Sequence, residues 1–365
     1  MNPRLQKFRK LLSVENLDAV FVSSLPNIIY LTNFSDFTTL DRDGYLFITK
    51  KNQYIFTHGI YKEAVEKKVK DFTLIDIKRE NPISTSIKTI IEKENIKILG
   101  FESFDLKVNE YEQLIKKIDK KILVPTNLIH NLRIHKSSDE IKEIKKACEL
   151  GDKAFGFLLK KLKPGITEIE LAVEFEFFIK SHGTDISFDS IIAFGPNASK
   201  PHHVPTNTKL KLNQFILFDC GVKLNNYCSD MTRTVFFGKA LNKQMKDYNE
   251  VLASQKEAIA FIQNKLKTEQ KIIGKEVDAA SRNYLIEKGY ISMPHSLGHG
   301  IGLEVHESPR LTILSEEVLQ NGMVFSIEPG IYLTGKFGIR IEDLFAIENN
   351  KLIQLTKASK NFIET

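Results

Sequence analysis

Residues 215–237 read FILFDCGVKLNNYCSDMTRTVFF, two apolar runs that flank a short polar segment. Short runs rich in β-branched and aromatic residues are typical of buried strands. The Asn pair between them favours a hairpin turn, because Asn tolerates left-handed backbone. Each run carries an acid, Asp219 in the first and Asp230 in the second. A hairpin folded between residues 224 and 225 would place these carboxylates opposite each other on one face, with Cβ atoms about 4.5–5.5 Å apart.

A second pair of apolar runs repeats this pattern further along the chain. One run ends at Glu328 and the other at Glu342, and the turn between them lies at residues 334–336. The midpoint of the two glutamates falls in this turn, so they also become cross-strand neighbours. Like charges opposite each other destabilise a sheet, and a buried carboxylate costs several kcal/mol unless it is compensated. Arg233 and Arg340 do not suffice to neutralise both pairs, so the pattern predicts bound divalent cations.

A histidine with a glycine on each side completes the candidate centre. His299 lies in the segment GHGIG, residues 298–302, where glycine lets the backbone pass close to a site and leaves the imidazole accessible. Carboxylates with one imidazole suit Mn²⁺, Fe²⁺, Co²⁺ or Zn²⁺, and bridging carboxylates can hold two such ions to activate a water for hydrolysis. The predicted metal ligands are Asp219, Asp230, His299, Glu328 and Glu342.

Each of these residues has a simpler interpretation when it is taken alone. A single acid among the 46 Asp and Glu residues is most often a solvated surface charge, and one His among nine is most often structural. The complete set, with two matched hairpin spacings, favours the metal centre. The glycine-rich segment lacks the patterns of a phosphate-binding loop. A zincin motif is also excluded, because Arg310 occupies the position of the second His in the sequence that begins His306-Glu307.

The chain is expected to form two domains. Its first third alternates apolar runs typical of strands with stretches of helical periodicity, which predicts a parallel or mixed sheet covered by helices. The predicted strands there are 18–23, 44–49, 53–57, 73–77 and 97–101, and the predicted helices are 60–69, 84–94 and 109–118. The polar segment His135–Glu140 contains a Ser-x-x-Glu capping box that starts a new helix. Hairpins with helices near 246–266 and 276–288 follow, so we expect an α/β domain at 1–135 and an α+β domain at 136–365.

The composition is that of an ordinary globular protein. The chain has 365 residues, of which 42% are apolar and 27% charged, and its net charge is +6. This modest charge is spread along the chain and gives no footprint for nucleic acid. Three cysteines are too few for a disulfide framework and favour a reducing compartment. No secretory signal is visible, and no apolar run reaches the about 20 residues of a membrane span. We therefore expect a cytoplasmic protein without nucleic-acid or membrane partners.

At these acids and this histidine the chain resembles the pita-bread metallopeptidase family, which includes methionine aminopeptidase, aminopeptidase P and prolidase. The matching stretches are Ala193–His202, Phe218–Gly221, Cys228–Thr234, His295–Pro309, Ser326–Tyr332 and Gly338–Asp343. The start of the chain resembles the creatinase-type domain of the same family, at Arg4–Phe8, Leu17–Val22 and Pro26–Thr32. The resemblance implies an α+β pita-bread catalytic domain preceded by a smaller α/β creatinase-type N-terminal domain. One departure is His58–Tyr61, where the family often has Asp-x-Arg-Tyr.

The resemblance also implies roles for the metal ligands. Asp219 would bind one ion, Asp230 and Glu342 would bridge both ions, and His299 and Glu328 would bind the other. The implied cofactors are two divalent ions, with Mn²⁺ first and Co²⁺, Zn²⁺ or Fe²⁺ as alternatives.

The implied reaction is hydrolysis of the peptide bond before a proline at the second position of a small peptide. Glu328 would pass a proton to the leaving nitrogen, and His202 and His306 would contact the substrate and the developing oxyanion. Arg340 would orient a metal ligand or the substrate carboxylate. The creatinase-type domain favours the proline-directed branch, so we expect an Xaa-Pro dipeptidase (prolidase), with an Xaa-Pro aminopeptidase as the alternative and a non-catalytic binding protein as a remote one. A second copy of the chain, in a homodimer, is the expected protein partner.

Overall fold

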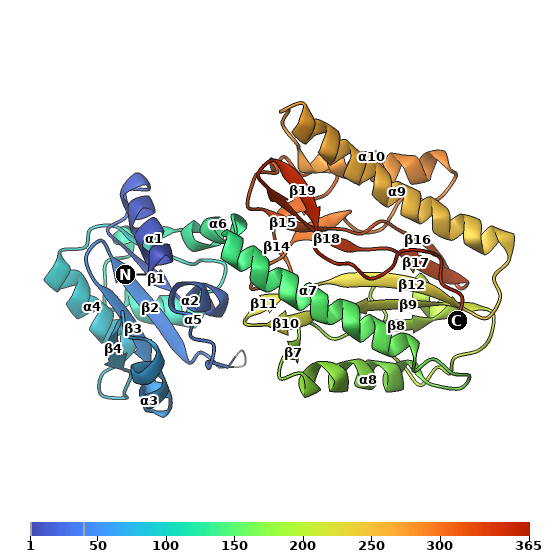
Figure 1. Ribbon diagram of the computed structural model, residues 1–365. Helices are drawn as coiled ribbons and strands as arrows, with labels where there is room; N and C mark the ends of the chain where they lie inside the picture. The colour runs from blue at the N-terminus through green and yellow to red at the C-terminus, as the bar shows by residue number, and fades with distance from the viewer. Residues whose placement is uncertain (1, 39–40) are drawn as a thin grey trace. The chain divides into compact units, whose positions relative to one another are not determined.

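The computed structural model describes residues 2–38 and 41–365 (Figure 1). The chain divides into two compact units, Met1–Arg133 and Ile134–Thr365. The first unit is built around a single sheet, and the second around several smaller ones. Within the described ranges, no helix is both long and apolar enough to cross a membrane. The three cysteines are free and buried.

The first unit contains a six-stranded mixed sheet in the order β4-β3-β2-β1-β5-β6. Its strands are β1 Ala19–Val22, β2 Gly44–Thr49, β3 Gln53–Thr57, β4 Thr73–Asp76, β5 Leu99–Phe101 and β6 Leu123–Pro125. Its helices are α1 Pro3–Val14, α2 Leu25–Thr32, α3 Gly59–Lys68, α4 Ile83–Glu94, α5 Val108–Ile115 and α6 Leu128–Ile134. Because β1 pairs antiparallel with β2 and parallel with β5, the predicted mixed sheet is confirmed.

Three helices of this unit, α1, α2 and α6, are not among the predicted ones. α1 has clear signals in the sequence. Asn2 caps it by accepting a hydrogen bond from the backbone N–H of Arg4 at 2.9 Å, and a proline follows the cap at the first helical position. Leu5, Phe8 and Leu12 are buried at helical spacing. The basic start of the chain is therefore a packed helix of the fold.

The second unit places its strands between two pairs of helices (Figure 1). The helices are α7 Ser138–Leu159, α8 Glu168–Ser181, α9 Asn242–Lys267 and α10 Gly274–Glu287. The strands are β7 Asp185–Ile186, β8 Ile191–Phe194, β9 Gln214–Cys220, β10 Val222–Leu224, β11 Tyr227–Cys228, β12 Met231–Phe237, β13 Gly298–Gly300, β14 Glu307–Leu311, β15 Val324–Ile327, β16 Gly330–Leu333, β17 Phe337–Arg340, β18 Asp343–Glu348 and β19 Lys351–Gln354. One apolar core joins α7 and α8 to β8, β9 and β12, and another joins α9 and α10 to β14, β15 and β18. This arrangement confirms the predicted α+β class.

The first acid-bearing hairpin forms in a register that differs from the prediction. Asp219 lies opposite Thr232, and not opposite Asp230, which is two residues earlier in the chain. The turn is formed by Asn225 and Asn226, both with positive φ, because a two-residue hairpin turn of this type requires left-handed backbone at both central positions. The correction shifts the pairing by two residues, so both acids remain on one face of the hairpin. Asp230 itself lies in a break between β11 and β12.

The second hairpin has the predicted register. Gly330 pairs with Arg340 and Ile331 with Ile339, so the hairpin is centred on Gly335 as the sequence indicates. The same register continues where Ile327 on β15 pairs with Asp343 on β18. Glu328 and Glu342 fall between these two ladders, and each interrupts a strand. Strand breaks at three of the four acids release these carboxylates from regular pairing and let them turn toward a common centre.

Candidate active site

The second unit contains a cavity of about 510 Å³ that gathers every predicted site residue. Those residues are His202, Asp219, Asp230, His299, His306, Glu328, Arg340 and Glu342. Asp219, Asp230, His299, Arg340 and Glu342 are buried and form the floor of the cavity, while His202 and His306 are exposed at its mouth. Side chains from seven strands or strand ends, together with His202 from the loop before β9, therefore converge on one site.

Three residues of the floor lie close enough together to share one metal ion. Ligand atoms of Asp230, His299 and Glu342 all fall within 4.8 Å of one another. Glu328 adds a further oxygen, since its Oε1 lies 3.3 Å from Nε2 of His299. Asp219 borders this group and lies on the same face of the hairpin as Asp230. The donor set is four carboxylates and one imidazole, which suits divalent transition metals.

The carboxylates of the floor lack the partners that buried acids require. Among the described residues, no hydrogen bond reaches Oδ1 of Asp219, Oδ1 of Asp230 or Oε1 of Glu342, although all three atoms are buried. Burial and then the neighbouring carboxylates raise the pKa of Asp230 and of Glu342 well above the usual range, and burial raises the pKa of Glu328 to about 7. An uncompensated cluster of this kind is strongly unfavourable. Bound cations would satisfy the orphaned oxygens and the repulsion together, so the residues present fit a metal centre.

His299 is held in the form that a metal requires. Its Nδ1–H donates to the carbonyl of Gly300 at 3.1 Å, which leaves Nε2 unprotonated and directed toward Asp230 at 3.7 Å and Glu328. Burial lowers the pKa of His299 to about 3, so the ring is neutral at physiological pH. A Cβ on Gly298 would lie 2.0 Å from the carbonyl oxygen of Ser326, and one on Gly300 would lie 2.1 Å from that of Ser308. The flanking glycines are therefore required by close backbone approach.

Arg340 fixes the acidic floor from one side. Its Nη2 donates to Oδ2 of Asp219 at 2.7 Å, and its Nε donates to the hydroxyl of Thr232 at 3.0 Å. That hydroxyl in turn donates to Oε2 of Glu342 at 2.7 Å, so one guanidinium positions two of the candidate ligands. The remaining Arg340 nitrogen donates to the hydroxyl of Tyr332 at 2.8 Å.

The Tyr332 hydroxyl is also hydrogen-bonded to His295, which extends this network. Nε2 of His295 lies 2.8 Å from the hydroxyl, and its Nδ1 lies 2.8 Å from the carbonyl of Ser296, to which it donates. Burial, followed by the charge of Arg340, lowers the pKa of His295 to about 4. The neutral ring therefore accepts the Tyr332 proton at Nε2, and His295 supports the site without lying among the carboxylates.

Several residues of the cavity are not singled out by the sequence as site residues. Phe188, Asp189, Ile191, Val305 and Arg310 line it as well. Their place depends on strand pairings that the motifs do not specify. Arg310 on β14 lies directly opposite His299 on β13, and Ile191 on β8 lies directly opposite Asp219 on β9. Only knowledge of which distant strands pair would have identified them.

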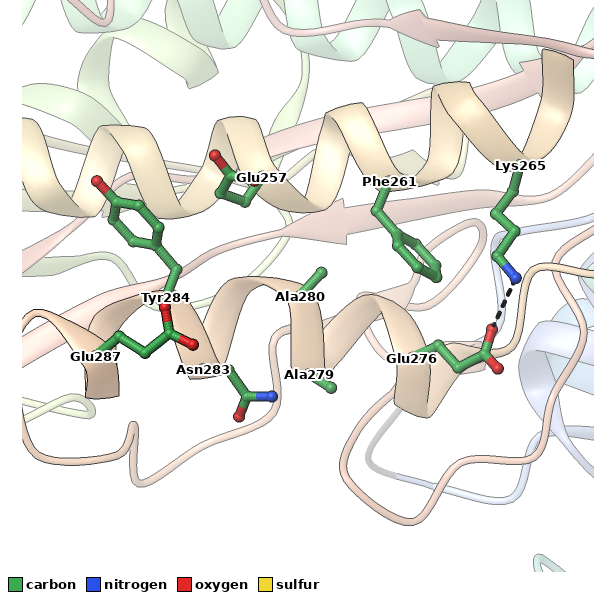
Figure 2. Close-up of a pocket in the computed structure, with 9 residues that line it drawn as sticks. All are labelled: Glu257, Phe261, Lys265, Glu276, Ala279, Ala280, Asn283, Tyr284 and Glu287. Atoms are coloured by element: carbon green, nitrogen blue, oxygen red, sulfur yellow. Dashed lines mark ion pairs between the residues drawn. The ribbon is translucent and has the colours of Figure 1, made fainter. Parts of the chain in front are cut away.

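A second hollow, of about 490 Å³, lies on the surface between α9 and α10 (Figure 2). Glu257, Glu276 and Glu287 point into it together with Phe261, and Lys265 pairs with Glu276 at 3.6 Å. The residues that line it include no histidine or cysteine and none of the predicted site residues. The group of potential metal ligands found among the described residues, Asp230, His299 and Glu342, therefore belongs to the first cavity.

Comparison with known proteins agrees with this geometry. Residues 142–349 match the family model for metallopeptidase family M24, and residues 4–135 match the creatinase/prolidase N-terminal domain. The chain is 34% identical to an Xaa-Pro dipeptidase from Pyrococcus horikoshii over 100% of this chain and 99% of the relative. An Xaa-Pro dipeptidase structure from Bacillus anthracis matches with a TM-score of 0.89 at 32% identity, over 99% of both chains.

An X-Pro aminopeptidase structure from Thermotoga maritima matches with a TM-score of 0.87 at 26% identity, over 98% of this chain and 100% of that one. Both branches expected from the motifs thus share the whole architecture. The family model, the full-length relatives and the converging acids together show that this chain is a peptidase that belongs to metallopeptidase family M24 and carries a creatinase/prolidase N-terminal domain.

Proposed function

We propose that the chain is an Xaa-Pro dipeptidase that depends on two divalent metal ions. The observation that carries this proposal is the division of the cavity into a buried acidic floor and an exposed cationic rim. The floor offers the orphaned oxygens of Asp219, Asp230 and Glu342, and the rim offers Arg310 with His306. A dipeptide fits such a site because its scissile bond and its free carboxylate are only a few ångströms apart.

The acidic floor holds the metal in this proposal. Asp219, Asp230, His299, Glu328 and Glu342 are the ligands, and manganese is the first candidate metal because the set is rich in oxygen. When bound, divalent ions polarise the scissile carbonyl and lower the pKa of the attacking water.

The remaining steps belong to side chains of the protein. Burial raises the pKa of Glu328 to about 7, which suits a group that accepts a proton from water and gives it to the leaving nitrogen near neutral pH. The serine hydroxyl of Ser326 donates to Oε1 of Glu328 at 3.0 Å and fixes its orientation. His202 and His306 reach the substrate from the mouth of the cavity, where they donate to the developing oxyanion and the peptide backbone.

We assign the binding of the substrate's free carboxylate, which belongs to the proline, to Arg310 and not to Arg340. All three nitrogens of the Arg340 guanidinium already donate within the floor, to Asp219, Thr232 and Tyr332. Arg310 lies opposite His299, is exposed and lines the cavity. A planar guanidinium binds a carboxylate in a two-pronged, charge-assisted geometry, which is worth about 1.5–3 kcal/mol. A tripeptide would carry its carboxylate past this residue and lose the contact.

The relatives support this choice between the two branches. The Pyrococcus horikoshii relative and the Bacillus anthracis structure, both named Xaa-Pro dipeptidases, are 34% and 32% identical to this chain. The Thermotoga maritima structure, named an X-Pro aminopeptidase, is 26% identical. An Xaa-Pro aminopeptidase is therefore the second candidate.

A comparison of three substrates tests the proposal. We expect the protein to hydrolyse Ala-Pro with a higher kcat/KM than Ala-Pro-Ala, and to leave Ala-Ala uncleaved, when assayed with Mn²⁺, Co²⁺ and Zn²⁺ in turn. Chelation should abolish the activity and Mn²⁺ should restore it. Faster hydrolysis of Ala-Pro-Ala would favour the aminopeptidase, and equal hydrolysis of Ala-Ala would exclude proline selectivity.

Substitution of Arg310 tests the reason for the preference. Arg310→Gln should lower kcat/KM for Ala-Pro by about 10–100-fold and for Ala-Pro-Ala much less, which removes the preference for the dipeptide. Arg310→Lys keeps the charge without the planar fork and should recover part of the loss. If Arg310→Gln lowers both activities equally, the carboxylate is bound elsewhere.

A further inference from the structure

The wall of the active-site cavity that leads into β8 carries an acid that the proposed hydrolysis does not use. Asp189 lines the cavity and is exposed. Among the residues described in the structure, no hydrogen bond or ion pair engages its side chain. It is exposed, whereas the five proposed metal ligands are buried or largely covered, so it stands apart from that group.

The position of Asp189 follows from the pairing of β8 with β9. Ile191 lies directly opposite Asp219, so both side chains point to the same face. Asp189 precedes Ile191 by two residues, in the segment that leads into β8, and it lines the same cavity as Ile191 and Asp219. Because Asp189 is exposed while Asp219 is buried, Asp189 lies toward the mouth of the cavity.

Apolar side chains line the cavity near Asp189 in the sequence. Phe188 and Ile191 line the cavity on either side of it in the sequence, together with Val305. Phe188 packs closely over the neighbouring strand, since a Cβ on Gly221 would lie 2.5 Å from its ring. A carboxylate at the end of an apolar wall is suited to a ligand that has an alkyl stem and a cationic head.

The charges at the mouth are separated between two walls. Arg310 and His306 belong to the wall of β13 and β14, in which Arg310 pairs with His299. His202 adds a third basic side chain to the lining. Asp189 is the exposed acid among the lining residues, because Asp219, Asp230 and Glu342 are buried in the floor and Glu328 is largely covered. A substrate carboxylate is thus drawn to one wall and a substrate cation to the other.

We propose that Asp189 determines the preferred first residue of the substrate, and that it binds the cationic side chain of a lysine or arginine that precedes proline. This inference rests on the proposed Xaa-Pro dipeptidase function and names the substrates within it. The alkyl stem of the lysine lies against Phe188 and Ile191, and its ammonium group reaches Asp189. The proline carboxylate is at the same time directed to Arg310 on the other wall.

Paired substrates test the proposal on the full-length protein loaded with metal. Lys-Pro and norleucine-Pro have side chains of nearly the same length and differ in the ammonium group. The wild-type protein should hydrolyse Lys-Pro with a kcat/KM about 3–10-fold above that for norleucine-Pro, mainly through a lower KM, and this ratio should fall at 0.5 M salt because the pair is exposed. Glu-Pro should be the poorest of the three substrates.

Substitution of Asp189 should remove this discrimination. Asp189→Asn should bring the Lys-Pro to norleucine-Pro ratio to about one and leave norleucine-Pro hydrolysis near wild type. Asp189→Lys should invert the order of Lys-Pro and Glu-Pro, a gain that a misfolded variant cannot produce. Asp185→Asn is the matched control, because Asp185 is an exposed acid on the nearby β7 that does not line the cavity. It should leave all ratios unchanged.

Two outcomes would overturn the inference. An equal loss on all three substrates in Asp189→Asn would assign the residue to a group that every substrate carries, such as the α-ammonium. Unchanged ratios in both Asp189 variants would show that Asp189 does not contact the substrate. Failure of the proposed function is distinguishable from both outcomes, because the wild-type protein would then hydrolyse none of the Xaa-Pro dipeptides.

Discussion

Glu102 in the first unit and the acidic floor in the second unit are both buried carboxylates, but their surroundings are opposite in kind. In the first unit, Oε2 of Glu102 accepts hydrogen bonds from the backbone N–H groups of Ser23 and Ser24, both at 2.7 Å. Its other oxygen accepts from the side-chain amide of Asn27. In the second unit, Asp230 and Glu342 are equally buried, yet each leaves an oxygen without a partner among the described residues.

This difference separates a structural acid from a functional one. Glu102 lies at the N-terminus of α2, where free backbone N–H groups and the helix dipole favour a negative charge. Its hydrogen bonds are complete, so it requires nothing further. The acids of the second unit are surrounded by other acids and are incomplete without a cation. A cluster of buried acids that each leave an oxygen unsatisfied, more than burial alone, therefore marks the candidate site.

The largest expected effect comes from removing one charge of the acidic floor. Glu342→Gln should lower kcat/KM by at least about 10³-fold, because one of the proposed metal ligands would be lost, and should reduce the bound metal measured by elemental analysis. The same substitution should raise the urea midpoint of the metal-free protein, since it relieves repulsion among buried carboxylates.

The same kind of substitution outside the site serves as the matched control. Glu348→Gln changes the same type of side chain at the far end of β18, where it is partly exposed, and should alter neither activity nor metal content. If Glu342→Gln retains its full metal content, or if the metal-free variant is less stable than the metal-free wild type, Glu342 does not belong to an incomplete centre.

The next effect concerns the basic residues at the rim. His202→Ala and His306→Ala should each lower kcat by roughly 10²–10³-fold, the loss typical of one oxyanion donor, while the metal content stays near that of the wild type. The ring centroids of His306 and His299 are 4.3 Å apart. Substitution of His306 therefore tests whether it contacts the substrate while its neighbour His299 binds the metal. Loss of metal in either variant would make that residue a ligand.

The acids of the site could be identified from the sequence because the signal is local. Glu342, just before β18, and Asp343, the first residue of β18, illustrate this. Successive side chains alternate between the two faces of a sheet, so these two acids face opposite sides. Asp343 is satisfied by Arg233 at 2.6 Å and by Lys360 at 2.6 Å, while Glu342 faces the cavity. Hairpin spacing alone indicates which acids share a face, even where the turn at Asn225–Asn226 shifts the predicted pairing by two residues.

The parts of the site that depend on strand pairings without a turn signal in the sequence could not be predicted. The position of Asp189 depends on the pairing of β8 with β9, and that of Arg310 on the pairing of β13 with β14, with an irregular register at His299. The role of Glu102 depends on backbone groups 78 and 79 residues away in the chain. No periodicity within a strand or helix specifies these contacts, so they follow only from the folded topology.

A smaller effect is expected from the pH dependence of Glu102. Burial raises its pKa to about 7, against the opposing hydrogen bonds from Ser24, Asn27 and Ser23. Between the ordinary glutamate pKa of 4.5 and about 7, the folded protein retains a proton that the unfolded chain releases, so this group makes the free energy of unfolding fall as pH rises. The loss is on the order of 3 kcal/mol between pH 4.5 and pH 8.

The variant Glu102→Gln isolates this contribution. Its neutral amide cannot titrate, so the difference in free energy of unfolding between wild type and variant should favour the wild type most at about pH 5 and shrink toward pH 8. Calorimetry of both full-length proteins at matched pH values measures this difference and cancels the other titrating groups. Parallel stability curves would show that the three hydrogen bonds hold Glu102 ionised throughout.

The smallest expected effect is the stabilisation that metal gives to the second unit. A ligand that binds only the folded state at 100 times its Kd adds about 2.7 kcal/mol to the free energy of unfolding. For a unit of this size that corresponds to a rise in Tm of roughly 5–10 °C on adding Mn²⁺ to the chelated protein. Glu102→Gln should show the full rise, because Glu102 lies outside the acidic floor, whereas Glu342→Gln should show little of it. An equal rise in both variants would place the stabilising ion away from Glu342, and would break the distinction between complete and incomplete buried acids on which the assignment of the site depends.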